Sequence, residues 1–364
     1  MILDLYIARK FLWLFARVFG GFLAILLMID VIDQLRRFGD PGISIGEALT
    51  LSAMNVPSSL YRILPLILIL AALGLFMGLA RSSELVVLRA SGRSGLRFLL
   101  APVATALILG GVAVAVLNPL VAATSKRYDV LSSGHARGAS VLSVSEAGLW
   151  LRQGDDRGQT VIQARRANLD GTELYDATFL TFAEDGTPLA RIEAATAALS
   201  EGFWQLSGAK SWPLAADNPE RDAQTQPDGL RIATDLTQET IRSGFGTPSA
   251  ISFWNLPGYI TGLDRAGFSA RAHRVWWQME LALPVFLAAM VLIAAAAAMR
   301  HARVARTGAM VLAALLGGFA LFFLRNFAQV LGENGQIPIA IAAWSPPLAG
   351  LLLALGLILH LEDG

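Results

Sequence analysis

The chain has 364 residues, of which 54% are hydrophobic and only 16% are charged. Soluble proteins carry about 25% charged residues, so this composition is typical of an integral membrane protein. The formal net charge of +1 gives no reason to expect nucleic acid as a partner. The absence of cysteine excludes disulfides, thiolate catalysis and zinc–thiolate sites.

Six segments remain apolar over roughly 20 residues or more, which is the length of a helix that crosses a bilayer. The first of them is too long for the apolar part of a signal peptide, and no small-residue cleavage site follows it, so it is expected to stay in the protein. The segments predict an α-helical membrane protein with three helices on each side of a long polar insert. They cover residues 11–31, 60–80, 98–121, 275–299, 308–331 and 337–361.

Basic residues in the short loops predict the orientation of these helices. Arg9 and Lys10 precede the first segment, four arginines lie within 81–97, and three lie within 300–306. Loops rich in arginine and lysine stay in the cytoplasm. Both termini are therefore expected to be cytoplasmic in a multi-pass protein of the inner (plasma) membrane. The insert is then periplasmic in a Gram-negative cell.

The polar insert has the pattern of an antiparallel β domain. Apolar and charged residues alternate over 190–194, and the pairs Asp170-Gly171 and Asp185-Gly186 are turn signals between such runs. This pattern favours a meander, a sandwich or a jelly roll. The fold class is therefore six transmembrane helices in a 3+3 arrangement with an inserted, jelly-roll-like antiparallel β domain. The expected domains are 1–121, 122–274 and 275–364.

The chain has no residues arranged to hydrolyse ATP or to hold a catalytic metal. A G-x-x-x-x-G-K-[ST] loop is absent, because Ala209 and Trp204 stand where glycines would precede Lys210-Ser211. The four histidines are scattered and lack the H-E-x-x-H spacing of a zinc site. We therefore expect no cofactor, no metal and no enzymatic activity of the chain's own.

A single short run, 42–46 (GISIG), matches the G-x-S-x-G pattern of serine hydrolases. That pattern requires a sharp turn from a strand into a helix. Here the run lies in a short loop between two apolar segments. A loop with glycine turns is the better interpretation.

Four arginines lie at or inside the outer ends of the apolar segments, where the orientation rule does not require them. Arg36 and Arg37 follow the first segment, Arg62 opens the second, and Arg325 lies within the fifth. A cation at the centre of a membrane helix costs about 2.5–3.5 kcal/mol, so it normally faces a cavity or a charged partner. Around one cavity, these arginines would bind the phosphates of an amphiphile whose acyl chains lie deeper in the membrane.

Each of these arginines also has a simpler explanation. Its side chain can reach the headgroups of ordinary phospholipids at the membrane surface. It can also pair with a carboxylate, such as Asp30, Asp33 or Glu333. Arg325 is the least compatible with lipid, because its neighbours in the sequence are apolar.

The cytoplasmic run 81–92 (RSSELVVLRASG) is too small to be an enzyme domain and is suited to docking on a partner. Its apolar residues Leu85, Val86 and Leu88 could also lie on the membrane surface as an interfacial helix. Glu84 argues against that alternative, because a carboxylate gains nothing from an anionic membrane surface. It is better placed to accept hydrogen bonds from an arginine of a docking partner.

Residues 83–92 resemble the coupling helix of the lipopolysaccharide-export permeases, the LptF/LptG family. Further short runs fit the same family in order: 33–37 (DQLRR), 56–57 (VP), 148–150 (GLW) and 337–338 (IP). The resemblance covers essentially the whole chain, including the three helices on each side of an outer β domain.

The resemblance implies a permease subunit of an ATP-driven ABC exporter, with lipopolysaccharide as its cargo. Its partners would be a cytoplasmic LptB-like ATPase dimer, a second, LptF-like permease and an LptC-like membrane protein. Lipopolysaccharide would be extracted from the outer leaflet of the inner membrane and passed to a periplasmic bridge.

The family's roles can be carried over to individual residues of this chain. Glu84 would dock on the ATPase, within a coupling surface that includes Leu85, Val86, Leu88 and Arg89. Arg36 and Arg37 would contact the phosphates of lipid A. A basic residue can stand three positions before the DQL run in the family, but here that position is Asp30. We therefore expect Arg62 or Arg325 to supply the missing cation.

Two other classes of protein share some of these features. A mechanotransmitting, permease-like protein would couple an ATPase to periplasmic partners without moving lipid, and it would need no basic collar. A membrane-embedded enzyme or receptor would need convergent catalytic groups or a cytoplasmic output domain, and the sequence has neither.

Overall fold

The computed structural model divides the chain into two compact units. The membrane unit contains Met1–Ser132, Ser252–Trp254 and Arg271–Gly364, and the β unit contains Ser133–Ile251 and Asn255–Ala270. The structure describes all residues except 1, 38–43, 82–94, 134–141, 146–147, 156–157, 169–170, 184, 217, 227–228, 235, 238–240, 242–247, 266–268, 300–306 and 364.

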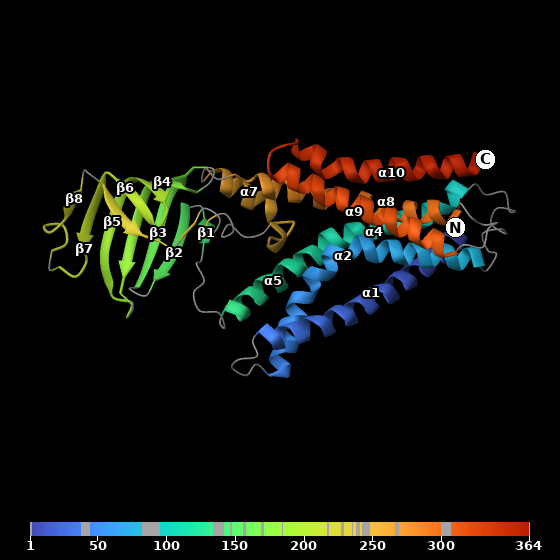
Figure 1. The fold of residues 1–364 in the computed structure, drawn as a ribbon, viewed down its shortest axis with the longest axis horizontal. Helices are drawn as coiled ribbons and strands as arrows, with labels where there is room; N and C mark the ends of the chain where they lie inside the picture. Colours follow the sequence, from blue (N-terminus) through green and yellow to red (C-terminus); the bar gives the residue numbers. More distant parts are fainter. Residues whose placement is uncertain are drawn as a thin grey trace. The chain divides into compact units, whose positions relative to one another are not determined.

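The membrane unit contains six helical spans that are long and apolar enough to cross a membrane (Figure 1). The third span is formed by α4, the π-helical turn η1 and α5 in succession. Three spans precede the β strands in the sequence and three follow them, which confirms the predicted 3+3 arrangement. The helices are α1 (Ile2–Arg37), α2 (Ile45–Arg81), α4 (Gly95–Val112), η1 (Ala113–Leu117), α5 (Asn118–Ser133), α8 (Arg271–Met299), α9 (Thr307–Glu333) and α10 (Ile339–Asp363).

The second span begins much earlier than the apolar pattern predicts. Ser44 and Glu47 form a capping box: the Glu47 N–H donates to Ser44 Oγ (3.2 Å), and the Ser44 N–H donates to Glu47 Oε2 (2.8 Å). This cap starts α2 at Ile45, and the helix then passes through Pro57. The prediction that Arg62 opens the span is therefore wrong, because Arg62 lies well inside α2. Polar residues in the first turns hid the helix from a hydropathy pattern.

The third span also continues further than predicted. The expected domain boundary after residue 121 falls within α5, which ends at Ser133. Lysine, arginine and serine side chains in the last turns of α5 lower its hydropathy without breaking the helix. The polypeptide of the β unit accordingly begins near Ser133 rather than at residue 122.

Helix α8 lies at the centre of the membrane unit, where it contacts α2, α4, α9 and α10. Its approach to α4 is especially close at Gly110. A Cβ atom added to Gly110 would lie 2.5 Å from Pro284 Cα and 2.9 Å from Pro284 Cβ. The absence of a side chain at Gly110 therefore allows the two helices to pack backbone against backbone.

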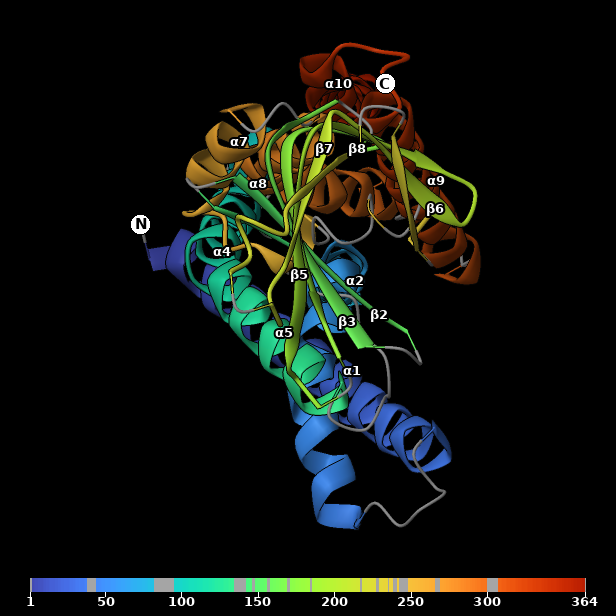
Figure 2. The ribbon, with the colours of Figure 1, turned by 90° about the vertical axis from the view of Figure 1, so that its left-hand side faces the viewer.

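The β unit is built on one antiparallel sheet in which nearly every strand pairs with its neighbours in the sequence (Figures 1 and 2). This confirms the predicted antiparallel domain, with the connectivity of a meander. The strands are β1 (Leu142–Ser145), β2 (Gly148–Asp155), β3 (Gly158–Ala167), β4 (Glu173–Phe182), β5 (Pro188–Ser200), β6 (Phe203–Ser207), β7 (Ala209–Pro213), β8 (Gln224–Gln226) and β9 (Leu230–Ala233).

Strands β6 and β7 are two halves of one strand, which is interrupted at Gly208. Both pair with β5 in a single continuous register, since Thr196 faces Ser207 and Glu193 faces Lys210. Gly208 has a φ of +63°, which a residue with a side chain rarely adopts. The outer edges of these halves pair with β9 and β8, respectively.

The sheet curls around an apolar core. Trp204 and Phe179 are fully buried in this core and contact each other edge-on, with ring centroids 6.3 Å apart. The Gln153 side chain of β2 donates to the Ala233 carbonyl at the end of β9 (2.9 Å), although these strands are far apart in the strand order. The short helix α7 (Leu256–Arg265) adds Leu263 to the same core.

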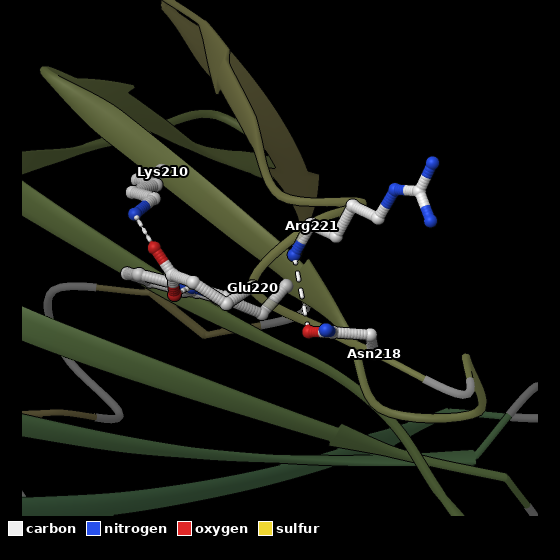
Figure 3. A network of polar contacts seen from close by, with 5 residues as sticks. Lys210, Asn218, Glu220 and Arg221 are labelled. Atoms are coloured by element: carbon white, nitrogen blue, oxygen red, sulfur yellow. Dashed lines mark hydrogen bonds and ion pairs between the residues drawn. The ribbon is translucent and has the colours of Figure 1, made fainter.

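A cluster of polar contacts holds the segment after β7 against the sheet (Figure 3). Lys210 Nζ donates to Glu220 Oε1 (2.6 Å), and Trp212 Nε1 donates to Glu220 Oε2 (2.5 Å). The Lys210 ammonium also lies 4.6 Å from the centroid of the Trp212 ring. A single carboxylate therefore fastens residues 218–222 to two side chains of β7.

We expect this contact to open in acid. The hydrogen bonds from Lys210 and Trp212 lower the pKa of Glu220 below its ordinary value. Their stabilising contribution is therefore complete above the ordinary carboxyl pKa and is lost as the pH falls through the lowered value. Hydrogen exchange of residues 214–223, corrected for the intrinsic pH effect, should show less protection at pH 3 than at pH 6. A Glu220→Gln variant should lose this pH difference; an equal difference in both proteins would contradict the prediction.

Candidate functional site

An open groove of about 330 Å³ lies between the last turns of α1 and the first half of α2. Its walls combine an apolar surface with two carboxylates and one guanidinium, so it could accept a molecule that is both apolar and charged. Of the four predicted phosphate-binding arginines, Arg36 is the one that lines this groove. The lining residues are Leu26, Ile29, Asp30, Ile32, Asp33, Arg36, Val56 and Ser59.

Asp30 of α1 is held by two amide side chains. Asn55 Nδ2 donates to Asp30 Oδ1 (2.7 Å), and Gln34 Nε2 donates to Asp30 Oδ2 (3.3 Å). Gln34 is only 1% exposed and also donates to the Tyr128 hydroxyl (3.0 Å). Asp30 therefore belongs to a hydrogen-bonded network that connects α1, α2 and α5.

The exposed guanidinium groups of Arg36, Arg37 and Arg62 are not paired with carboxylates in the part of the chain that the structure describes. Arg36 and Arg37 form the last turn of α1, whereas Arg62 lies in the interior of α2. The described contacts therefore do not support the alternative that Asp30 or Asp33 neutralises these arginines. These three cations remain able to meet an external anion.

Arg325 has a different environment from the other three arginines. It lies in α9, partly buried, with its Cζ atom 5.2 Å from the centroid of the Phe286 ring of α8. It also interacts electrostatically with Glu280 of α8 and with Tyr61 of α2. Arg325 thus faces the interior of the membrane unit on at least one side.

Glu280 is the residue of this region that sequence reasoning missed. Its side chain is 1% exposed, and its Oε2 atom accepts a hydrogen bond from the Tyr61 hydroxyl. A carboxylate inside an apolar membrane helix is by itself a signal of function, and Glu280 lies within the fourth apolar segment. Glu280 could therefore have been singled out from the sequence, but its interaction partners lie on other helices that are distant in the sequence.

The predicted coupling residues Glu84, Leu85, Val86, Leu88 and Arg89 lie outside the described residues. Helix α2 ends at Arg81, before this run, and helix α4 begins at Gly95, after it. The docking role of this run therefore stays a prediction.

Six apolar helices, three before and three after an antiparallel β domain in the sequence, define the class of a multi-pass membrane protein. The family model of the lipopolysaccharide export system permease LptF/LptG matches residues 5–360, and the chain belongs to this family. The resemblance seen in the sequence is thereby confirmed.

Curated relatives match over almost their entire length. The LptG permease of Haemophilus influenzae is 23% identical over 99% of both chains. The LptG permease of Escherichia coli K12 is 25% identical over 99% of this chain and 98% of its own. The chain is therefore similar to LptG permeases from end to end, in both the membrane helices and the β domain.

Proposed function

We propose that this chain is an LptG-type permease subunit, which moves lipopolysaccharide from the outer leaflet of the inner membrane towards a periplasmic bridge. The observation that carries this proposal is the family match over residues 5–360. The membrane topology follows from the basic loops, with both termini in the cytoplasm and the β domain in the periplasm. ATP is hydrolysed by a partner, since the chain has no phosphate-binding loop.

The lipid A phosphates bind to Arg36 and Arg37 at the end of α1 and to Arg62 inside α2. Arg36 lines an open groove with an apolar wall, and Arg37 and Arg62 are exposed and lack carboxylate partners among the described residues. Guanidinium groups bind phosphate with paired, charge-assisted hydrogen bonds. Arg325 supplies a further cation once it is released from its internal contacts.

The transport cycle is mechanical. An LptB-like ATPase dimer docks on the run that contains Glu84 and moves α2 and α4 when ATP closes the dimer. The cavity between this chain and an LptF-like permease then narrows, and the lipid is expelled upwards, past an LptC-like protein. Such a cycle requires two states that bind the lipid with different affinity.

The docking role is tested by replacing its carboxylate. In a Glu84→Ala variant we expect co-purification of the ATPase to fall by about tenfold, because a charge-assisted hydrogen bond contributes roughly 1.5–3 kcal/mol. Elution from a size-exclusion column checks that the variant is folded. Glu362→Ala, which removes an acid from the C-terminal end of α10, is the matched control and should leave co-purification unchanged. Undiminished co-purification of the Glu84 variant would refute the docking role.

A further inference from the structure

A buried polar cluster in the membrane unit joins four helical elements. Glu280 of α8 accepts a hydrogen bond from Tyr61 of α2 and interacts with Asn118, the first residue of α5. Arg325 of α9 interacts electrostatically with Glu280. Charged side chains inside membrane-spanning helices are costly, so the presence of a carboxylate and a guanidinium in this cluster requires a physical reason.

The carboxylate of Glu280 interacts with two polar side chains, Tyr61 and Asn118. Tyr61 satisfies Oε2, whereas Oε1 is buried without a hydrogen-bond partner among the described residues. Asn118 is itself fixed, because its Oδ1 atom accepts the N–H of Phe253 (2.8 Å). Phe253 in turn stacks on the Trp277 ring of α8, at a centroid distance of 6.4 Å. These contacts determine the position of the carboxylate.

Arg325, in contrast, is attracted electrostatically by Glu280 but is not fixed by an ion pair with it in the described structure. In the described part of the chain Arg325 forms no ion pair with a carboxylate, and Glu280 is the carboxylate that acts on it electrostatically. Its guanidinium lies over the face of the Phe286 ring, with Cζ 5.2 Å from the centroid, in a cation–π interaction. Arg325 is itself only partly buried, so its guanidinium can be reached from outside the membrane unit as well as from Glu280.

We propose that Glu280 is the resident counter-ion of Arg325, and that the phosphate of a bound lipid must compete with Glu280 for this arginine. The proposal rests on the lipid-export function proposed above, and it assigns Glu280 a positioning role that acts through Arg325. Glu280 keeps Arg325 neutralised when no lipid is bound, which avoids an isolated buried charge. A phosphate that captures Arg325 leaves the Glu280 carboxylate uncompensated.

This competition lowers the affinity of the protein for the phosphorylated lipid. The energy lost at Glu280 on binding is recovered when the headgroup leaves and Arg325 returns. A transporter benefits from such a device, because a site that binds its cargo too tightly cannot release it. Tyr61 and Asn118 contribute to this competition by keeping the Glu280 carboxylate in place.

The test measures binding of a fluorescent bis-phosphorylated lipid A to the full-length protein, in nanodiscs together with the subunits that co-purify with it. Glu280→Gln should bind this probe about tenfold more tightly, because the phosphate no longer competes with a carboxylate for Arg325. The same lipid without its phosphates should bind both proteins equally. Glu333→Gln, which removes a carboxylate from the end of α9, is the matched control and should not change the affinity.

A double variant separates this role from a general effect on the fold. Glu280→Gln/Arg325→Gln keeps the interior neutral and should bind the probe as weakly as Arg325→Gln alone, because Glu280 acts only through Arg325. If Glu280→Gln alone does not fold, this comparison still tests the proposal. Equal or weaker binding by folded Glu280→Gln, or a double variant that differs from Arg325→Gln, would overturn it. If the wild-type protein does not distinguish the two lipids, the proposed export function itself fails.

Discussion

Reversing both charges at the end of α1, in an Arg36→Glu/Arg37→Glu variant, is expected to weaken the binding of bis-phosphorylated lipid A by about a hundredfold or more. Each charge-assisted hydrogen bond to a phosphate contributes roughly 1.5–3 kcal/mol, and 1.4 kcal/mol corresponds to a factor of ten. Repulsion by the new carboxylates adds to this loss. Titration of the fluorescent lipid into the purified protein in nanodiscs measures the effect directly.

An adjacent pair of arginines in the β unit provides the control for this experiment. Arg165 and Arg166 are both exposed on β3, and Arg166 lies 3.9 Å from Asp176. Reversing these two charges changes the net charge by the same amount at a different place. We expect that control to leave the lipid affinity within about twofold, since the β unit contributes no residue to the proposed phosphate site. Equal losses in both double variants would show that α1 has no special role in phosphate binding.

The second large effect is expected at the contact between α4 and α8. In a Gly110→Ala variant the new methyl group would lie 2.5 Å from Pro284 Cα, and backbone atoms cannot move aside as a flexible side chain could. The helices must separate, at a cost of about 3 kcal/mol, which is the upper part of the usual range for overpacking. Thermal unfolding of the detergent-solubilised protein, followed by size-exclusion chromatography, should show a clear decrease in the midpoint.

The neighbouring glycine is a control of the same chemistry. A Cβ atom at Gly111 meets nothing within 4 Å, so Gly111→Ala adds the same methyl group on the open side of α4. That variant should unfold at the wild-type temperature or slightly above it, because alanine favours a helix more than glycine does. If the two variants have the same midpoint, the close packing at Pro284 is not important for stability.

The helices were predictable because the bilayer imposes a length and an apolar composition on each span. The β domain was predictable because alternating residues and glycine turns are local signals: Gly171 and Gly186 do adopt the positive φ that such turns require. The start of α2 was not predicted. It depends on a capping box whose polar residues a hydropathy pattern interprets as loop.

The candidate site was less accessible to sequence reasoning than the fold. The arginines could be identified individually, but the groove arises from α1 and α2 together, and only Arg36 of the four lines it. Glu280 and Tyr61 are separated by 219 residues, so their hydrogen bond exists only after the helices have packed. Charged residues inside apolar segments can be found from the sequence, whereas their partners depend on tertiary contacts.

The most direct test of the account is to purify the protein from detergent-solubilised membranes and to identify the bound proteins and lipids by mass spectrometry. The account predicts a second six-span permease, an ATPase with a phosphate-binding loop, and a phosphorylated lipid A species in one complex. An ATPase without lipid A would instead support a mechanotransmitting protein that moves no lipid. The absence of any ATPase would contradict the coupling role of the Glu84 run and the transport mechanism built on it.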